Sequence, residues 1–374
     1  MKIVVDDKIP FIRGAFEPFA QVEYLPGAKI SREDLTDAQA LVTRTRTKCN
    51  ETLLKGTAVK FIATATIGYD HIDVEYCRKA GIEWTNAPGC NSGSVMQYMA
   101  SALVALSARK GFRLEDKIIG IVGVGAVGSK VARLAEIFGM KTLLNDPPRQ
   151  RAEKSSAFAS LEETLKAADI LTLHVPLIRE GQDKTYHMID RQALALMKEG
   201  SFLINTSRGE AVETGALLQS LRSGKLAGAV LDVWENEPHI NLELLELTDI
   251  ATPHIAGYSV DGKANGTTMS VRAVGDYFGW DLKEWRPADL PGPARPVIDF
   301  SGLKKDRDDW VAKAVLHTYD IMNDDQRLRE RVEDFEKLRG DYSPRREFAA
   351  YSVNLPQGYD SLREKLAALG FKIK

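Results

Sequence analysis

The sequence contains little cysteine and no long apolar run, and each scarcity excludes a class of protein. Three cysteines in 374 residues are too few for a disulfide framework, and no Cys-x-x-Cys pair or Cys/His cluster suggests a metal site. Reduced thiols and a cytoplasmic location are therefore expected. The apolar runs are much shorter than a membrane span, and the strand-like segment KIVVDD directly follows Met1. We accordingly expect neither a membrane helix nor a signal peptide.

An excess of charge of either sign is also lacking. The formal net charge is −2, which gives no general attraction to nucleic acid or to an anionic membrane. Any anion must then be bound by local arginines. The hydrophobic fraction of 44% is ordinary for a globular protein, and the length allows two or three domains with cores of their own.

Short apolar runs alternate with helical patterns in two series, which predicts parallel sheets. In the first series we expect strands at 2–7, 40–45, 61–68 and 82–89, and a helix at 70–81. A helix apolar on most of its faces is predicted from about 95 to 109. The second series has six candidate strands, at 117–123, 141–146, 169–176, 201–207, 227–234 and 249–256. This rhythm is typical of a doubly wound nucleotide-binding sheet.

The character of the chain changes after about residue 281. Four prolines in 284–296 predict an irregular linker. A charged helix is expected at 324–342, and a final helix and strand at 361–374. These elements predict a small third α/β domain.

A glycine-rich turn follows the first strand of the second series. Gly123, Gly125 and Gly128 fit G-x-G-x-x-G between a strand and a helix, the context that a dinucleotide-binding turn requires. The amides near Ala126 and Val127 would then face the phosphates at the positive end of the helix. Asp146 ends the next strand, where a carboxylate can bind the adenosine ribose and repel a 2′-phosphate. The turn therefore predicts NAD rather than NADP, although Asp146 could also be a simple turn residue before two prolines.

Three further strands of this series are each followed by a residue suited to hydride transfer from an alcohol. Arg208 can bind a substrate carboxylate, His254 can take the hydroxyl proton, and Glu237 can orient that histidine. Strand ends meet at one edge of a parallel sheet, so these residues can converge. His174 is a rival base, but no acid accompanies it in the sequence.

An anion site is also suggested in the first series. In TRTRTK (43–48), Arg44 and Arg46 alternate with hydroxyl side chains just after a strand, so that they could bind a phosphate. The alternative is that both arginines lie on a solvated edge.

The motifs GIVGVGAVG, LINTSRG, LDVWENEP and TPHIAGY resemble those of the D-isomer-specific 2-hydroxyacid dehydrogenases over roughly residues 1–280. The resemblance implies that Arg208, Glu237 and His254 are catalytic, with Asp232 and Gly257 beside the nicotinamide. It also implies an α/β architecture of three parts. These are a Rossmann-type doubly wound NAD-binding domain at 95–255, a discontinuous flavodoxin-like substrate domain at 1–94 and 256–282, and a small C-terminal α/β dimerisation domain at 283–374.

Other segments, among them TATIGYDHID, HIAGYSVDGKANGTT and FEKLRGDYSPRREF, resemble one branch of that family over nearly the whole chain. The branch oxidises the C2 hydroxyl of a phosphorylated 2-hydroxyacid on the way to pyridoxal 5′-phosphate and is homodimeric. The resemblance implies substrate contacts by Thr45, Thr66 and Tyr258. We further hypothesise that Arg345 or Arg346 reaches the substrate phosphate of a partner subunit, although a dimer salt bridge would explain them equally well.

Two alternatives stay open at this point. The chain could be another NAD-dependent dehydrogenase of a phosphorylated 2-hydroxyacid, such as 3-phosphoglycerate, or an NAD(H)-sensing protein of the same fold without catalysis.

Overall fold

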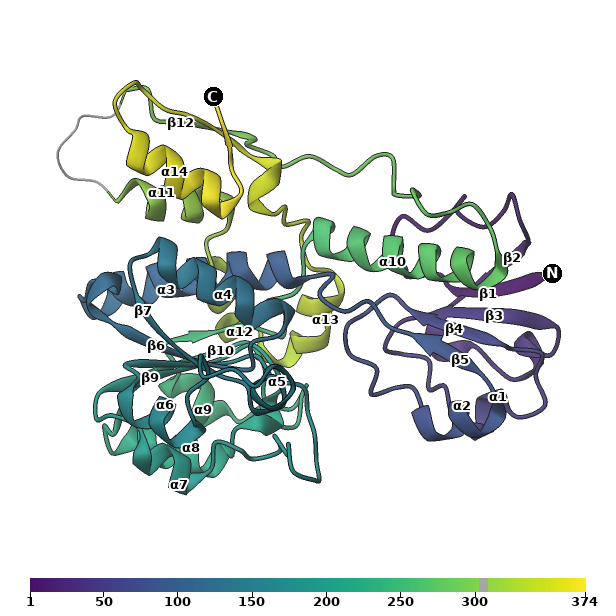
Figure 1. The fold of residues 1–374 in the computed structure, drawn as a ribbon, viewed down its shortest axis with the longest axis horizontal. Helices are drawn as coiled ribbons and strands as arrows, with labels where there is room; N and C mark the ends of the chain where they lie inside the picture. Colours follow the sequence, from purple (N-terminus) through teal and green to yellow (C-terminus); the bar gives the residue numbers. More distant parts are fainter. Residues whose placement is uncertain (303–308) are drawn as a thin grey trace. The chain divides into compact units, whose positions relative to one another are not determined.

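The computed structural model describes residues 1–302 and 309–374 (Figure 1). The chain forms two compact units: the first comprises Met1–Asn91 and Ser259–Pro291, and the second comprises Ser92–Tyr258 and Gly292–Lys374. The division into three domains that the sequence suggests stays a prediction. Among the described residues, no helix combines the length and apolar character needed to cross a membrane.

The first unit is built on a five-stranded parallel sheet in the order β2-β1-β3-β4-β5. This is the flavodoxin-like strand order. The strands are β1 (Lys2–Asp6), β2 (Gln21–Leu25), β3 (Ala38–Thr43), β4 (Phe61–Thr64) and β5 (Glu83–Thr85). Strand β2 was not expected from the sequence, because its side chains are exposed or only partly buried and give no apolar run. The helices are α1 (Glu51–Leu54), α2 (Val74–Ala80) and α10 (Val260–Phe278).

Alternate residues of these strands face two separate cores, as a pleated strand requires. Ile3 and Val5 pack with Val271 and Val274 of α10 on one face. Val4, between them, packs on the other face with residues around α1 and α2. Burial on both faces explains why these strands are continuous apolar runs in the sequence.

The second unit contains a six-stranded parallel sheet in the order β11-β10-β9-β8-β6-β7. The strands are β6 (Ile118–Val122), β7 (Lys141–Asn145), β8 (Ile170–Leu173), β9 (Ser201–Asn205), β10 (Leu226–Leu231) and β11 (Ile250–Ala251). All six strands of the predicted second series are therefore present. The direction of strand succession reverses beside β6, and such a switch point is where doubly wound sheets bind ligands.

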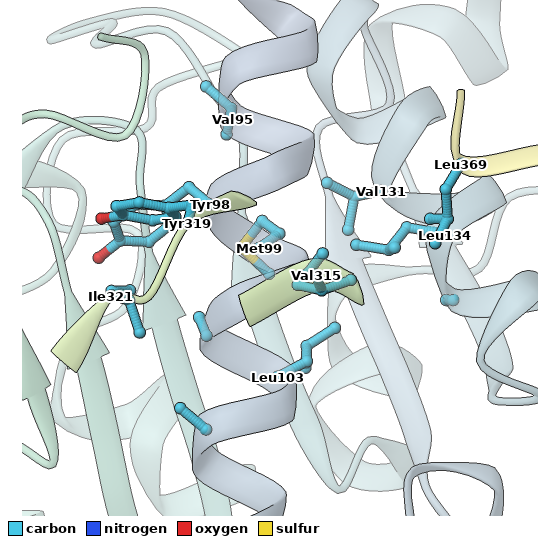
Figure 2. Packing of buried hydrophobic residues seen from close by; sticks show 14 of the residues in the cluster. Val95, Tyr98, Met99, Leu103, Val131, Leu134, Val315, Tyr319, Ile321 and Leu369 are labelled. Carbon is cyan, nitrogen blue, oxygen red and sulfur yellow. The ribbon is translucent and has the colours of Figure 1, made fainter. Parts of the chain in front are cut away.

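Helices cover both faces of this sheet (Figure 1). On one face, α3 (Ser92–Lys110) and α4 (Ala126–Ile137) form a core with β6 and with C-terminal residues, as Figure 2 shows for Tyr98, Met99 and Tyr319. The nearly all-round burial of α3 agrees with its apolar sequence. The other helices are α5 (Pro147–Glu153), α6 (Leu161–Ala167), α7 (Arg191–Leu196), α8 (Thr214–Arg222) and α9 (Leu242–Leu247).

The C-terminal part of the second unit adds a small parallel sheet in the order β12-β13-β14. Its strands are β12 (Val297–Asp299), β13 (Ser352–Asn354) and β14 (Lys372–Ile373). Its helices are α11 (Trp310–Thr318), α12 (Met322–Glu330), α13 (Phe335–Gly340) and α14 (Asp360–Leu369). The α/β fold class, including a small C-terminal α/β part, is confirmed.

The single charged helix expected at 324–342 is wrong. The chain leaves the helix after Glu330, because Arg331 adopts φ −145° and ψ 50°, and α13 begins only at Phe335. Arg331 forms an ion pair with Asp334 across this break. Helices α12 and α13 are therefore two separate helices.

Candidate active site

All strands of the six-stranded sheet are parallel, so their carboxyl ends lie along one edge. Strand β6 leads into the glycine-rich turn, and β9 leads to Arg208. Strand β10 leads to Asp232 and Glu237, and β11 leads to His254. The predicted cofactor turn and the three predicted catalytic residues are therefore delivered to the same edge of one unit.

His254 and Glu237 form a close pair. The Nδ1 atom of His254 lies 2.8 Å from Oε2 of Glu237, and the other carboxylate oxygen accepts a bond from the Trp234 amide at 2.9 Å. Because an ionised carboxylate only accepts, the neutral imidazole must carry its proton on Nδ1. Its Nε2 is then left with a lone pair, which is what a general base requires.

The environment of Glu237 keeps this carboxylate charged. Burial opposes ionisation, but the bonds from His254 and the Trp234 amide, together with the charge of Arg339, outweigh it and lower the pKa of Glu237. The carboxylate can therefore stabilise an imidazolium on His254 when a proton arrives.

Asp232 fixes the backbone that carries His254. Its buried carboxylate accepts bonds from the Thr252 hydroxyl at 2.7 Å and from the amides of Ile255 and Ala256 at 2.7 and 2.9 Å. His254 has φ 56°, a left-handed conformation that is costly for a residue other than glycine. Burial raises the pKa of Asp232, while these bonds and His254 counteract that effect. Asp232 thus supports the histidine loop, and its predicted contact with the nicotinamide stays a prediction.

Arg208 reaches the same edge because the chain turns sharply after β9. The buried Asn205 side chain accepts a bond from the Ser207 amide and donates one to the Arg208 carbonyl at 2.9 Å. Gly209 then lies so close to the backbone of Trp234 that a Cβ atom on it would be 2.0 Å from the Trp234 carbonyl carbon. This close approach brings Arg208 and Glu237 to one place.

A pocket of about 350 Å³ is lined by all three predicted catalytic residues, Arg208, Glu237 and His254. Other residues contribute the remaining charged and aromatic groups of its wall: Arg179, Tyr186, Glu210, Trp234 and Glu235. A cation for a carboxylate and a base for a hydroxyl proton therefore border one space of substrate size.

The glycine-rich turn has the geometry that a pyrophosphate requires. Gly123 has φ 86°, and a Cβ atom there would meet the His174 carbonyl oxygen at 2.4 Å. On Gly128, a Cβ atom would meet the Gly123 carbonyl oxygen at 2.0 Å. Gly125, at the N-cap of α4, has open space instead. Two glycines thus allow close packing, and the third leaves room above the helix end, so the turn fits a bound dinucleotide.

Asp146 contacts this turn directly. One carboxylate oxygen accepts a bond from the Val124 amide at 2.8 Å, and the other caps α5 through the Arg149 amide at 3.0 Å. The structure therefore shows a capping role for Asp146, and its contact with the ribose stays a prediction.

His174 is not suited to be the base that the sequence left open. Its two ring nitrogens lie near the hydroxyls of Thr172, at 3.0 Å, and Thr206, at 3.3 Å. Burial lowers the pKa of His174 to about 3, so this imidazole binds a proton too weakly to serve as the base near neutral pH.

The predicted substrate residues of the first unit share one sheet edge. Arg44, Thr45 and Arg46 follow β3, and Thr66 follows the neighbouring strand β4. Thr45 and Arg46 are exposed, whereas Arg44 donates a bond to the Lys8 carbonyl at 3.0 Å.

Sequence reasoning missed His71 in the first unit. The hydroxyls of Thr64 and Thr66 lie 2.9 Å apart, and Nε2 of His71 lies 3.1 Å from the Thr64 hydroxyl. Burial lowers the pKa of His71, although Asp70 opposes the shift. The signal available was its position within TATIGYDHID.

Tyr258 and Gly257 follow His254 and are half-buried. Arg345, in contrast, is not placed to reach the substrate phosphate of a partner subunit, as we had hypothesised. The residue is 6% exposed, its Nη2 donates to the Ala256 carbonyl at 2.6 Å, and its guanidinium lies 4.2 Å from the Tyr319 ring centroid. Arg345 is therefore a buried cation of its own unit, and only Arg346 stays a candidate for the partner's phosphate.

Comparison with known proteins identifies the class. Residues 95–256 match the model described as D-isomer specific 2-hydroxyacid dehydrogenase, NAD binding domain, and residues 290–370 match a domain of unknown function, DUF3410. The chain belongs to the D-isomer-specific 2-hydroxyacid dehydrogenase family. It is an NAD-dependent oxidoreductase, as predicted.

Several relatives within this family share one name. The chain is 50% identical to an erythronate-4-phosphate dehydrogenase of Bacteroides thetaiotaomicron, covering 94% of this chain and 99% of that protein. It is 44% identical to the enzyme of that name from Photorhabdus laumondii, covering 99% of each.

Solved structures agree with this family. The D-lactate dehydrogenase from Aquifex aeolicus complexed with NAD and lactic acid is 30% identical, with a TM-score of 0.63 over 76% of this chain and 97% of that one. The NAD⁺-bound 3-phosphoglycerate dehydrogenase of Entamoeba histolytica is 26% identical, with a TM-score of 0.64 over 78% and 99%.

Proposed function

We propose that the chain oxidises the C2 hydroxyl of 4-phospho-D-erythronate to the 2-oxo acid, with NAD as acceptor, in the formation of pyridoxal 5′-phosphate. The observation that carries this proposal is the pairing of His254 with Glu237 at a pocket that Arg208 also lines. The choice of substrate is supported by the shared name of relatives that cover nearly the whole chain.

In this mechanism, Arg208 binds the C1 carboxylate of the substrate through a charge-assisted pair. Nε2 of His254 takes the proton of the C2 hydroxyl, and Glu237 stabilises the imidazolium that results. Residues 123–128 would hold NAD, which would supply the acceptor for the hydride from C2. The Ala126 and Val127 amides at the positive end of α4 would hold its phosphates, with Asp146 on the ribose and Asp232 and Gly257 beside the nicotinamide.

The substrate phosphate is assigned to the loop after β3 in the first unit. Arg44, Thr45 and Arg46 offer two cations and a hydroxyl there, and Thr66 follows on the adjacent strand. Tyr258 is assigned a further substrate contact. We also propose that the protein works in the cytoplasm as a homodimer through residues 283–374, with the NAD-binding domain at 95–255 and the substrate domain at 1–94 and 256–282.

A comparison of substrates tests the function. We expect NADH formation to be at least about 100-fold more efficient, by kcat/KM, with 4-phosphoerythronate than with 3-phosphoglycerate, because the same trio would act on both and only the contacts to the rest of the molecule differ. Initial rates at 340 nm measure both. Faster turnover of 3-phosphoglycerate would favour the other phosphorylated-hydroxyacid dehydrogenase, and no NADH with any hydroxyacid would favour an NAD(H)-sensing protein.

A variant of Asp146 tests the cofactor assignment. We expect Asp146→Ala to raise the KM for NAD about tenfold and to reduce the preference for NAD over NADP, because a ribose acceptor and a repulsive charge are both lost. Initial rates with each cofactor measure the change. Asp146→Asn serves as the control, since it keeps one oxygen for the Val124 amide while it removes the charge and the second acceptor, which caps α5. An unchanged ratio of NAD to NADP efficiency in both variants would contradict the assignment.

A further inference from the structure

The region matched by the domain of unknown function contains α12 and α13, and it is anchored on the NAD-binding sheet. Asp325 of α12 accepts a bond from the Ala251 amide of β11 at 2.7 Å, which covers the open edge of that strand. Arg329 donates to the carbonyls of Leu245 and Thr248, both at 2.7 Å. The α12 segment is thus fastened to the strand that leads to His254.

Helix α13 is held by apolar contacts on the same side. Phe335 is 1% exposed and belongs to the core beneath the sheet, together with Leu328 of α12, and Leu338 packs against that core. Tyr342, just beyond α13, donates to Asp324 at 2.7 Å and meets the Tyr258 ring edge-on. These anchors fix the face of α13 on which Arg339 lies.

Arg339 approaches the proposed catalytic pair. Its Nη1 lies 3.9 Å from Oε2 of Glu237, the oxygen that also pairs with Nδ1 of His254. The guanidinium carbon is 6.0 Å from the Tyr258 ring centroid, and Glu336 lies 3.5 Å from Nη1. Nε of Arg339 is buried without a hydrogen-bond partner among the described residues. The side chain as a whole is half-buried, and a buried donor without a partner is costly, so the position of Arg339 beside Glu237 needs an explanation.

We propose that Arg339 is a positioning residue of the dehydrogenase: its charge on Glu237 limits how strongly that carboxylate stabilises the imidazolium of His254. When Glu237 interacts with both Arg339 and the His254 imidazolium, it stabilises the imidazolium less than it would if it interacted with His254 alone. Oxidation of an alcohol requires a neutral base, so this limit on Glu237 serves the reaction. The C-terminal region thereby acts on the chemistry from within its own chain.

Other charged groups also face this pair, and they stay the same when Arg339 is replaced. Asp232, beneath the histidine loop, interacts with His254 electrostatically. The pocket wall carries Arg179 and Arg208 and the carboxylates Glu210 and Glu235. Arg339 approaches Glu237 and is not among the residues that line the pocket.

The test is the pH dependence of Arg339→Gln. Removing one positive charge makes the imidazolium easier to form, so the acid limb of the kcat/KM profile for oxidation should move up by about 0.5–1 pH unit. Arg339→Lys keeps the charge and should restore most of the wild-type profile. Lys337→Gln is the matched control, since this lysine is exposed on α13 itself and its loss removes the same charge, so the profile should stay unchanged. The proposal would be overturned if the acid limb of Arg339→Gln coincided with that of the wild-type enzyme. It would also be overturned if the Arg339→Gln and Arg339→Lys variants lost the same activity and neither acid limb moved.

A second variant decides the question if Arg339→Gln does not fold. Glu336→Gln removes a carboxylate that shares Arg339, so the acid limb should move down by a few tenths of a pH unit. An unmoved or raised limb would count against the proposal.

The inference rests on the proposed function, and an NMR titration separates the two. The His254 ring, assigned with His254→Gln, should show a titration midpoint higher in Arg339→Gln than in wild type by the same 0.5–1 unit, without substrate. If the wild-type protein fails to oxidise 4-phosphoerythronate, the proposed substrate is wrong, and the NMR midpoint still decides on Arg339.

Discussion

His254→Ala is expected to lower kcat for oxidation of 4-phosphoerythronate by about two to four orders of magnitude, the range for a positioned general base. The only imidazole nitrogen engaged by Glu237 is Nδ1, so Nε2 is the atom that would take the hydroxyl proton. NAD affinity should change little, because the glycine-rich turn and Asp146 do not depend on this side chain. Initial-rate kinetics with NAD and substrate varied separately measure both quantities.

A second histidine provides a control matched in chemistry. Nε2 of His187 lies 2.6 Å from Oε1 of Glu235, and Glu235 lines the same pocket. The second oxygen of Glu235 accepts a bond from the Thr214 amide at 2.8 Å, so this pair ties the loop after β8 to α8. We expect His187→Gln to reduce kcat less than about tenfold. Near-wild-type turnover of His254→Ala, or a larger loss from His187→Gln, would show that the base is misassigned.

The sheet and its chemically active edge could be predicted from the sequence because both leave local signals. Burial on two faces makes each parallel strand a short apolar run, and the end of that run locates the ligand edge. The motif adds a turn in which Gly123 and Gly128 are required, because a Cβ atom on either would lie 2.0–2.4 Å from a backbone oxygen. The arginine, glutamate and histidine then follow as the polar residues after β9, β10 and β11.

The break between α12 and α13 has no such local signal. Leu328, Val332, Phe335 and Leu338 are spaced as on the apolar face of one continuous helix. The chain nevertheless leaves the helix at Arg331, and both pieces dock on the core beneath the sheet. Tertiary packing decides this geometry, and the approach of Arg339 to Glu237 depends on it. One charged residue among many in the predicted charged helix could not be recognised as part of the site.

The support of His254 was also hidden from sequence reasoning. Asp232 was expected beside the cofactor, whereas its carboxylate accepts three bonds from residues 252–256. Strain at one residue in the left-handed region costs of order 1–3 kcal/mol and persists only where surrounding contacts enforce it. Asp232 provides these contacts and so holds the backbone of His254 in this conformation.

Arg208→Gln is expected to lower kcat/KM by about 10²–10³-fold. Removal of one partner of a desolvated charge pair typically costs roughly 2–5 kcal/mol, and the expected loss lies within that range. Glutamine keeps polar atoms of similar reach but loses the positive charge that would hold the substrate carboxylate. The kcat/KM of Arg208→Lys should lie between those of the wild-type enzyme and Arg208→Gln, because an ammonium keeps the charge but not the planar fork. Steady-state kinetics with 4-phosphoerythronate provide the measurement.

Arg179 supplies the matched control for Arg208, since it lines the same pocket. Its side chain is 62% exposed, and its guanidinium lies 5.1 Å from the Tyr186 ring centroid, which leaves it near solvent. Arg208, in contrast, is placed by the bond between Asn205 and its own carbonyl and by the glycine that follows it. We therefore expect Arg179→Gln to reduce kcat/KM less than tenfold. If Arg179→Gln cost as much as Arg208→Gln, the pocket would be attracting anions by its summed charge, and the specific role of Arg208 would have to be given up.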